Sequence, residues 1–215
     1  MIQGIIFDWD GVIADSLSYY YKFLKMLSEK ENKEFPYRNF TDFKIRMPQS
    51  FSEAVRILGI KSNNPFEEYG PLYKKYMGSN ISIFKGMKSL IETKPMKFGI
   101  ASAGLQHIIE SMLKKENLSQ KFSSIIGYKD GIRMKPEPDA LLLCAREMKI
   151  GPKNAIYVGD FYTDIIAAKR AGMKSIAVTW GYSTKEVLKQ ENPDFIAERP
   201  KDIWKIVDQL NNGAA

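Results

Sequence analysis

The strongest indication of the fold is the stretch Gly4-Ile5-Ile6-Phe7-Asp8-Trp9-Asp10-Gly11-Val12-Ile13-Ala14-Asp15-Ser16. Its apolar run Ile5 to Phe7 is typical of a central strand covered on both faces, and Gly11 permits a tight turn after it. Asp8 and Asp10 therefore leave the carboxyl end of a strand, the edge at which open α/β sheets bind ligands. Two such carboxylates can hold a hard divalent cation, or act as nucleophile and proton donor.

A purely structural interpretation of these acids is that one caps the following helix and the other is solvated. Asp15 and Ser16 supply a better N-cap for that helix. Asp8 and Asp10 are thereby left without a structural explanation, which favours a chemical one.

Four motifs follow one another along the chain. They are Asp8-x-Asp-Gly-Val-x-x-Asp-Ser, Ala101-Ser102-Ala103-Gly104, Lys135-Pro-Glu-Pro-Asp139 and Gly159-Asp160-Phe-Tyr-Thr-Asp164-Ile-Ile-Ala-Ala168. In this order they resemble the haloacid dehalogenase superfamily, in particular its phosphatase branch with a helical cap, which includes phosphoglycolate phosphatases and β-phosphoglucomutases. The resemblance covers essentially the whole chain except the segment from about 16 to 83, where only length and helical character match.

The order of expected elements predicts the architecture. After Ser16 we expect a helix to about Glu31 and three shorter helices near 39–46, 51–58 and 66–76, with no strand between them. From Phe84 onward strands and helices alternate, with helices expected at 85–93, 104–117, 138–149, 163–171, 185–190 and 203–210 and strands at 96–101, 122–127, 155–158, 175–178 and 195–196. The fold class is therefore α/β: a doubly wound, Rossmann-like parallel-sheet core of residues 1–15 and 84–215, with an all-helical cap domain of residues 16–83 inserted.

The resemblance implies a role for each motif. Asp8 would be the nucleophile that takes the phosphoryl group, and Asp10 would protonate the leaving alkoxide and then deprotonate water. Ser102 and the backbone at Ala103 would receive phosphate oxygens, although a capping serine is an equal alternative. Lys135 would neutralise the developing charge on the phosphoryl group. A lone lysine is normally solvated, but this one stands in a Lys-Pro-x-Pro-Asp motif.

A metal site is implied by the same motifs. Asp160 and Asp164 follow the strand expected at 155–158, within one loop or first helical turn. With Asp8 and the backbone carbonyl of Asp10 they would form an oxygen-only site, which suits Mg²⁺. The alternative is that Asp164 caps its helix, and one side chain can do both.

Composition excludes several classes of protein. The chain has 215 residues, a net charge of +7 and one cysteine, Cys144, which we expect to be a buried structural thiol. The lysines are dispersed, so we expect no nucleic-acid partner, and the positive balance favours small anionic metabolites. No apolar run approaches the roughly 18 residues of a membrane span, so we expect no membrane partner, a cytoplasmic location and a monomer or homodimer.

The resemblance thus implies a Mg²⁺-dependent phosphatase acting on a small phosphorylated metabolite through an aspartyl-phosphate. A phosphotransferase of the β-phosphoglucomutase type stays open, although that subfamily usually carries a histidine where this chain has Tyr19-Tyr20-Tyr21. A non-catalytic phosphometabolite-binding protein also stays open, although no catalytic position is missing. In the cap, Arg46 and Lys44 are hypothesised to contact a second anionic or polar group of the substrate, against the alternative that both are solvated.

Overall fold

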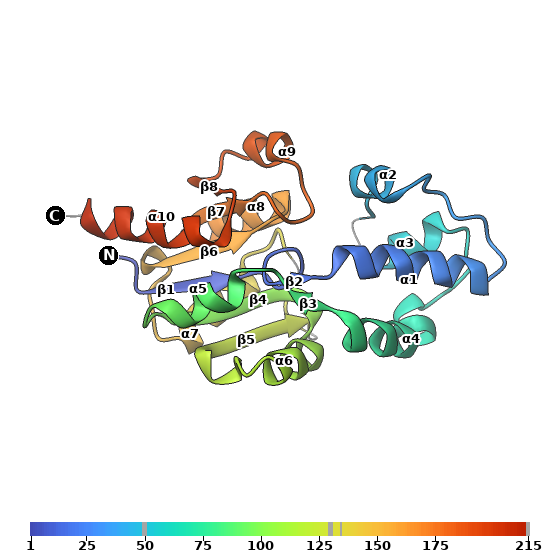
Figure 1. Ribbon diagram of the computed structural model, residues 1–215, viewed down its shortest axis with the longest axis horizontal. Helices are drawn as coiled ribbons and strands as arrows, with labels where there is room; N and C mark the ends of the chain where they lie inside the picture. Colours follow the sequence, from blue (N-terminus) through green and yellow to red (C-terminus); the bar gives the residue numbers. More distant parts are fainter. Residues whose placement is uncertain (49–50, 129–130, 134, 214–215) are drawn as a thin grey trace. The chain divides into compact units, whose positions relative to one another are not determined.

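The computed structural model describes residues 1–48, 51–128, 131–133 and 135–213, and the chain divides into two compact units (Figure 1). Unit 1 comprises Met1–Asp15 and Ile83–Ala215, and unit 2 comprises Ser16–Ser82. Two short strands, β2 (Ala14–Asp15) and β3 (Ser82–Ile83), pair with one another where the chain passes from one unit to the other.

Unit 1 is built on a six-stranded sheet with the order β5-β4-β1-β6-β7-β8, in which all pairs are parallel. The strands are β1 (Gly4–Phe7), β4 (Lys97–Leu105), β5 (Phe122–Tyr128), β6 (Ala155–Gly159), β7 (Lys174–Val178) and β8 (Phe195–Ala197). All four residues of β1 are buried between β4 and β6, as its apolar run predicts. The predicted α/β fold with a doubly wound parallel sheet is confirmed.

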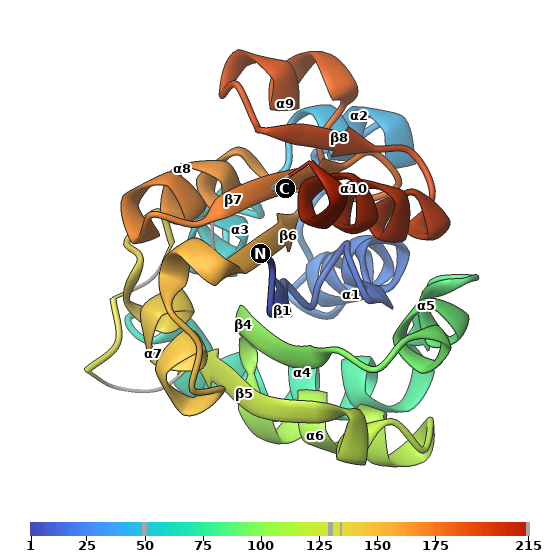
Figure 2. The ribbon, with the colours of Figure 1, turned by 90° about the vertical axis from the view of Figure 1, so that its left-hand side faces the viewer.

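Helices cover both faces of this sheet (Figure 2). They are α5 (Met87–Thr93), α6 (Gln106–Lys115), α7 (Asp139–Glu147), α8 (Tyr162–Ala171), α9 (Lys185–Gln190) and α10 (Pro200–Asn212), with 3-10 turns at Ser119–Lys121 and Pro152–Asn154. On one face α7 and α8 pack against the sheet in a cluster that includes Leu141 and Ala168. On the opposite face α5 and α10 are joined by Trp204 Nε1, which donates to Leu90 O at 3.0 Å.

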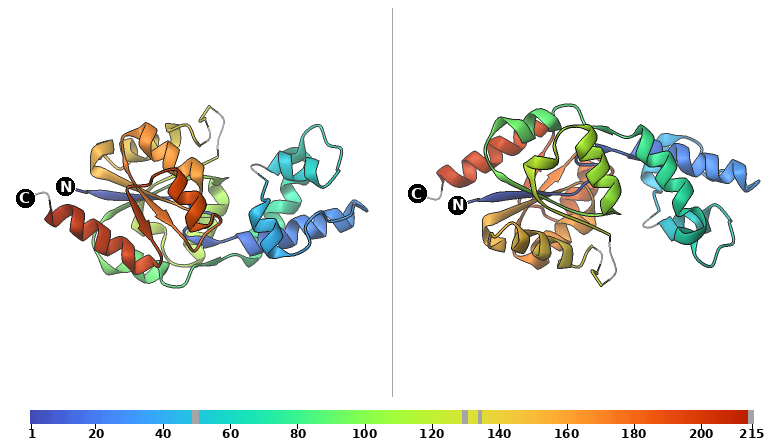
Figure 3. Two further views of the ribbon diagram at one scale, coloured as in Figure 1. Left: turned by 90° about the horizontal axis from the view of Figure 1, so that it is seen from above. Right: turned by 90° about the horizontal axis from the view of Figure 1, so that it is seen from below.

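Apart from Ser82, the first residue of β3, the regular elements of unit 2 in the part of the chain that the structure describes are helices (Figure 3). Its helices are α1 (Leu17–Lys30), α2 (Phe40–Ile45), α3 (Phe51–Ile57) and α4 (Pro65–Asn80). Aromatic rings fill its core: Phe43 is fully buried, and its ring centroid lies 5.0 Å from that of Tyr37 and 5.3 Å from that of Tyr21. The four helices expected between Ser16 and Tyr76 are all present.

The structure corrects the boundary between the second predicted core strand and its helix, and the predicted cap of the first helix. The strand expected to end at Ala101 continues as β4 to Leu105, and the helix expected from Gly104 begins at Gln106. The reason is that Leu105 still pairs with Tyr128 of β5 after an irregularity in the register, so the backbone stays extended for four more residues. Ser16 is the N-cap residue of α1 by position, but its side chain makes no capping hydrogen bond.

Among the described residues, no helix combines the length and the apolar character that a membrane-spanning helix needs.

Candidate active site

Four of the residues singled out in the sequence meet at the carboxyl edge of the sheet in unit 1. The carboxylates of Asp8, Asp160 and Asp164 each place an oxygen within 4.8 Å of the others, and all three residues are buried. Lys135 Nζ lies 3.0 Å from Asp8 Oδ2 and 2.6 Å from Asp164 Oδ1. Asp8 follows β1, Asp160 follows β6 and Asp164 lies in the first turn of α8, so parallel strands bring them together.

Burial controls the protonation of this cluster. It raises the pKa of the Asp8 carboxyl from 3.8 to about 7, a rise that Lys135 opposes and Asp164 reinforces. Burial and the neighbouring carboxylates likewise raise the pKa of Asp160 well above its ordinary value. Burial opposes the charge of Lys135, but Asp164 and Asp8 outweigh it and raise the lysine pKa well above 10.5. The site therefore holds a charged lysine and a carboxylate cluster that needs further positive charge to ionise fully.

Asp164 is both a helix cap and a partner of the lysine. Its Oδ2 accepts the backbone N–H groups of Asp160 at 3.1 Å and Phe161 at 2.9 Å, and its Oδ1 accepts from Lys135. The Tyr157 hydroxyl also lies 3.5 Å from Oδ1, so nearly all of the roughly four lone-pair positions of this carboxylate are already occupied. Asp8 and Asp160 thus have more capacity for a cation than Asp164.

Two glycines let backbone approach Asp160 closely. A Cβ on Gly11, whose φ is +76°, would lie 2.1 Å from Asp160 Oδ2, and one on Gly181 would lie 2.2 Å from the same oxygen. That oxygen also accepts the backbone N–H of Tyr182. Sequence reasoning did not find the Gly181-Tyr182 segment, because only the loop after β7 carries it to the site.

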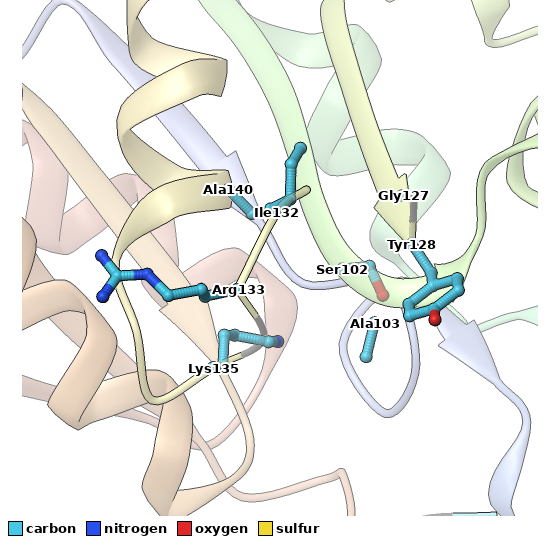
Figure 4. Close-up of a pocket in the computed structure, with 8 residues that line it drawn as sticks. All are labelled: Ser102, Ala103, Gly127, Tyr128, Ile132, Arg133, Lys135 and Ala140. Carbon is cyan, nitrogen blue, oxygen red and sulfur yellow. The ribbon is translucent and has the colours of Figure 1, made fainter. Parts of the chain in front are cut away.

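Ser102 and Asp10 both lie close to Gly104. A Cβ on that glycine would be 3.2 Å from Asp10 Oδ2 and 3.6 Å from Ser102 Oγ, so a larger residue would crowd the Asp10 carboxylate. Ser102 Oγ also accepts the N–H of Gly104 at 3.1 Å. Ser102, Ala103 and Lys135 line a small hollow in unit 1, in which the Lys135 side chain extends toward Ser102 (Figure 4).

Tyr157 is a site residue that sequence reasoning missed. It lies in β6 and is 1% exposed, yet its hydroxyl donates to Ala101 O at 2.8 Å and accepts from Lys135 Nζ at 3.1 Å. The available signal was a tyrosine inside a buried strand, since a buried phenol normally requires a hydrogen-bond partner.

Arg46 and Lys44 belong to unit 2, where Arg46 takes part in a local network. Its Nη1 lies 3.1 Å from Asp42 Oδ2 and donates to Pro36 O at 3.1 Å, and its guanidinium lies over the Tyr37 ring. Lys44 is half-buried in α2. The contact of these two residues with a substrate stays a prediction.

The acid cluster fits a divalent cation. Its three carboxylates and one ammonium, if all are ionised, leave two negative charges in excess, the charge that one divalent ion would balance. The donors are all oxygens, as hard cations such as Mg²⁺ prefer. The pKa rises of Asp8 and Asp160 are what burial of uncompensated carboxylates produces, and a cation would reverse them.

Comparison with known proteins agrees with this geometry. Residues 5–178 match the model of the haloacid dehalogenase-like hydrolase family. A pyrophosphatase from Oceanobacillus iheyensis is 26% identical over 96% of this chain and 97% of its own, and a phosphoglycolate phosphatase from Aquifex aeolicus is 28% identical over 96% and 97%.

Solved structures show the same fold. A haloacid dehalogenase-like hydrolase from Streptococcus pneumoniae superposes with a TM-score of 0.82 at 20% identity, covering 96% of this chain and 98% of that one. A protein described as a predicted phosphoglycolate phosphatase, from Haemophilus somnus, gives 0.83 at 21% identity, with 96% and 98% coverage. With the family match over most of its length and the acid and lysine cluster in place, this chain belongs to the haloacid dehalogenase-like hydrolases, as an enzyme of their phosphatase class.

Proposed function

We propose that the protein is a Mg²⁺-dependent phosphatase that hydrolyses a small phosphorylated metabolite through an aspartyl-phosphate on Asp8. The observation that carries this proposal is the buried Asp8 carboxylate, held 3.0 Å from Lys135 Nζ at the carboxyl edge of the sheet. Full-length relatives named as a pyrophosphatase and a phosphoglycolate phosphatase support a small, strongly anionic substrate.

The first step is the transfer of the phosphoryl group. An Asp8 carboxylate oxygen attacks phosphorus, the bond to the ester oxygen breaks, and Asp10 gives its proton to the leaving alkoxide. Lys135 neutralises charge that develops on the phosphoryl oxygens, and Ser102 with the Ala103 backbone holds them. Asp10 then takes a proton from water, which attacks the aspartyl-phosphate, releases inorganic phosphate and restores Asp8.

The cation would be held by Asp8, Asp160 and the backbone carbonyl of Asp10, with Asp164 nearby. When bound, Mg²⁺ would reduce the repulsion between the anionic nucleophile and the anionic phosphate. Asp164 would act mainly by anchoring Lys135 and the start of α8, since its oxygens already accept hydrogen bonds from both.

A phosphate-release assay tests the proposal. The purified chain is incubated with p-nitrophenyl phosphate, and then with a panel of phosphorylated metabolites that includes phosphoglycolate and inorganic pyrophosphate. Each is measured with Mg²⁺ and with excess chelator. Release that requires Mg²⁺ supports the proposal, and inertness toward every phosphate compound tried would favour a binding protein instead.

A further inference from the structure

Lys135 has three N–H donors, and the structure engages each of them. One is directed to Asp8 Oδ2 at 3.0 Å, one to Asp164 Oδ1 at 2.6 Å and one to the Tyr157 hydroxyl at 3.1 Å. An ammonium has no lone pair, so the hydroxyl can only accept from it. Two anchors, Asp164 and Tyr157, therefore hold the ammonium in place, and its third N–H is directed at Asp8.

The Tyr157 hydroxyl also has acceptors for its own proton. Because it accepts from Lys135, that proton is available for donation, and Ala101 O at 2.8 Å is a nearer acceptor than Asp164 Oδ1 at 3.5 Å. Its ring packs in the aliphatic cluster between β6 and the helices α7 and α8, and the whole residue is buried. Backbone pairing with Ile6 on one side and Ser175 on the other keeps the residue in the middle of the sheet.

One hydroxyl thus connects three separate parts of the site. Tyr157 comes from β6, its acceptor Ala101 immediately precedes Ser102, and its donor Lys135 comes from the segment before α7. The lysine ammonium lies 3.1 Å from the tyrosine hydroxyl and 5.6 Å from the centre of its ring, so the hydroxyl is the contacting group.

We propose that Tyr157 is a positioning residue, whose hydroxyl fixes the Lys135 ammonium where it meets the phosphoryl group during transfer from substrate to Asp8. This inference rests on the proposed phosphatase function. A lysine has a flexible four-carbon chain, so losing one of two anchors lets the ammonium move away from the position at which it stabilises developing charge.

The variant Tyr157→Phe removes only the hydroxyl. We expect kcat for p-nitrophenyl phosphate to fall about tenfold with KM changed much less, because the lysine acts mainly on charge that develops in the transition state. The variant should also lose stability, since Ala101 O loses the hydrogen bond from Tyr157, so a lower melting temperature does not discriminate. Tyr69→Phe is the matched control: Tyr69 is a buried tyrosine of unit 2 outside the proposed sites, and its loss of a hydroxyl should leave kcat unchanged.

A double-mutant cycle separates positioning from general structure. If Tyr157 acts through the lysine, Tyr157→Phe should have no further effect on kcat once Lys135→Met has removed the ammonium. An equal tenfold loss in both backgrounds would overturn the proposal, as would an unchanged kcat in Tyr157→Phe alone.

Crystal structures of the unmodified chain and of Tyr157→Phe, solved under the same conditions, provide a measurement independent of turnover. We expect Lys135 Nζ to leave its position between Asp8 and Asp164, or to occupy several. If it keeps both contacts unchanged, the positioning role is wrong. This measurement also decides the matter if Lys135→Met does not fold. Failure of the phosphatase assay with the unmodified chain would refute the proposed function, whereas the two crystal structures would still decide the lysine's dependence on Tyr157.

Discussion

Unit 1 and unit 2 bury different kinds of side chain and place their charges differently. Unit 1 has an aliphatic core, and at its sheet edge the Asp8 and Lys135 side chains are 10% and 9% exposed. Unit 2 has an aromatic core, and its Arg46 side chain is 51% exposed where it pairs with Asp42. Charges interact strongly only where water is excluded, so the Asp8 and Lys135 charges in unit 1 are coupled more strongly than the exposed Arg46 is to Asp42 in unit 2.

The largest expected effect is on the nucleophile of unit 1. Asp8→Asn keeps the size of the side chain and leaves an oxygen to accept from Lys135, but it removes the attacking carboxylate. We expect kcat to fall by at least about 10⁴-fold for every substrate, with phosphate binding retained. Appreciable turnover in the purified variant, with deamidation excluded by intact mass, would show that Asp8 is not the nucleophile.

The second largest effect is expected on the free energy of unfolding, and it distinguishes the two units. Phe43→Ala in unit 2 and Phe98→Ala in unit 1 each remove a buried ring and should each cost about 3–5 kcal/mol. The three tryptophans, at positions 9, 180 and 204, all belong to unit 1. We therefore expect Phe98→Ala to shift the thermal transition followed by tryptophan fluorescence. Phe43→Ala should leave that transition in place and lower the melting temperature of only part of the helical circular dichroism, because both units contain helices.

Coincident transitions in both variants would mean instead that the two units unfold as one. Full retention of helical signal by Phe43→Ala at the original midpoint would show that the ring cluster around Tyr21 and Tyr37 contributes little.

The variant Arg46→Ala tests whether unit 2 contributes to recognition of the substrate. We expect a loss of about 2–3 kcal/mol, or about 30- to 150-fold, in kcat/KM for the physiological substrate and little loss for p-nitrophenyl phosphate. Arg38→Ala is the matched control, because Arg38 Nη2 lies 3.2 Å from Asp42 Oδ1, the same carboxylate that Arg46 contacts. Equal effects of the two variants would assign Arg46 a structural role through Asp42.

A smaller shift is expected in the metal requirement. Asp160→Ala should raise the Mg²⁺ concentration for half-maximal activity by at least about tenfold, since it removes one oxygen ligand from the proposed site. Asp160→Asn, which keeps the side-chain volume and an acceptor for the Tyr182 N–H, separates loss of the negative charge from loss of packing. Calorimetric Mg²⁺ binding that is unchanged in both variants would place the cation elsewhere.

The smallest effect concerns Cys144. Burial raises the pKa of its thiol to about 12, so almost no thiolate is present at neutral pH. We expect negligible reaction with a thiol reagent in the folded protein and one equivalent after denaturation. The reaction rate then reports opening of unit 1, and Phe43→Ala should leave it unchanged if the disturbance stays within unit 2.

Most of the architecture could be predicted from local patterns. The apolar run before Asp8, the regular alternation after Phe84 and the run of helices after Ser16 each identify their elements with small errors at the ends. The end of β4 was misplaced because Leu105 pairs with Tyr128, a contact between strands that no local pattern carries.

The sequence by itself determined which acids lie at strand ends and that they share one edge of the sheet, because parallel strands all end on the same side. Only the tertiary structure decided how they are paired. Lys135 divides its three donors among Asp8, Asp164 and Tyr157, and the Gly181 loop reaches Asp160, through contacts between residues distant in the chain. Such contacts depend on how strands and loops are placed in space, which residue spacing along the chain does not encode.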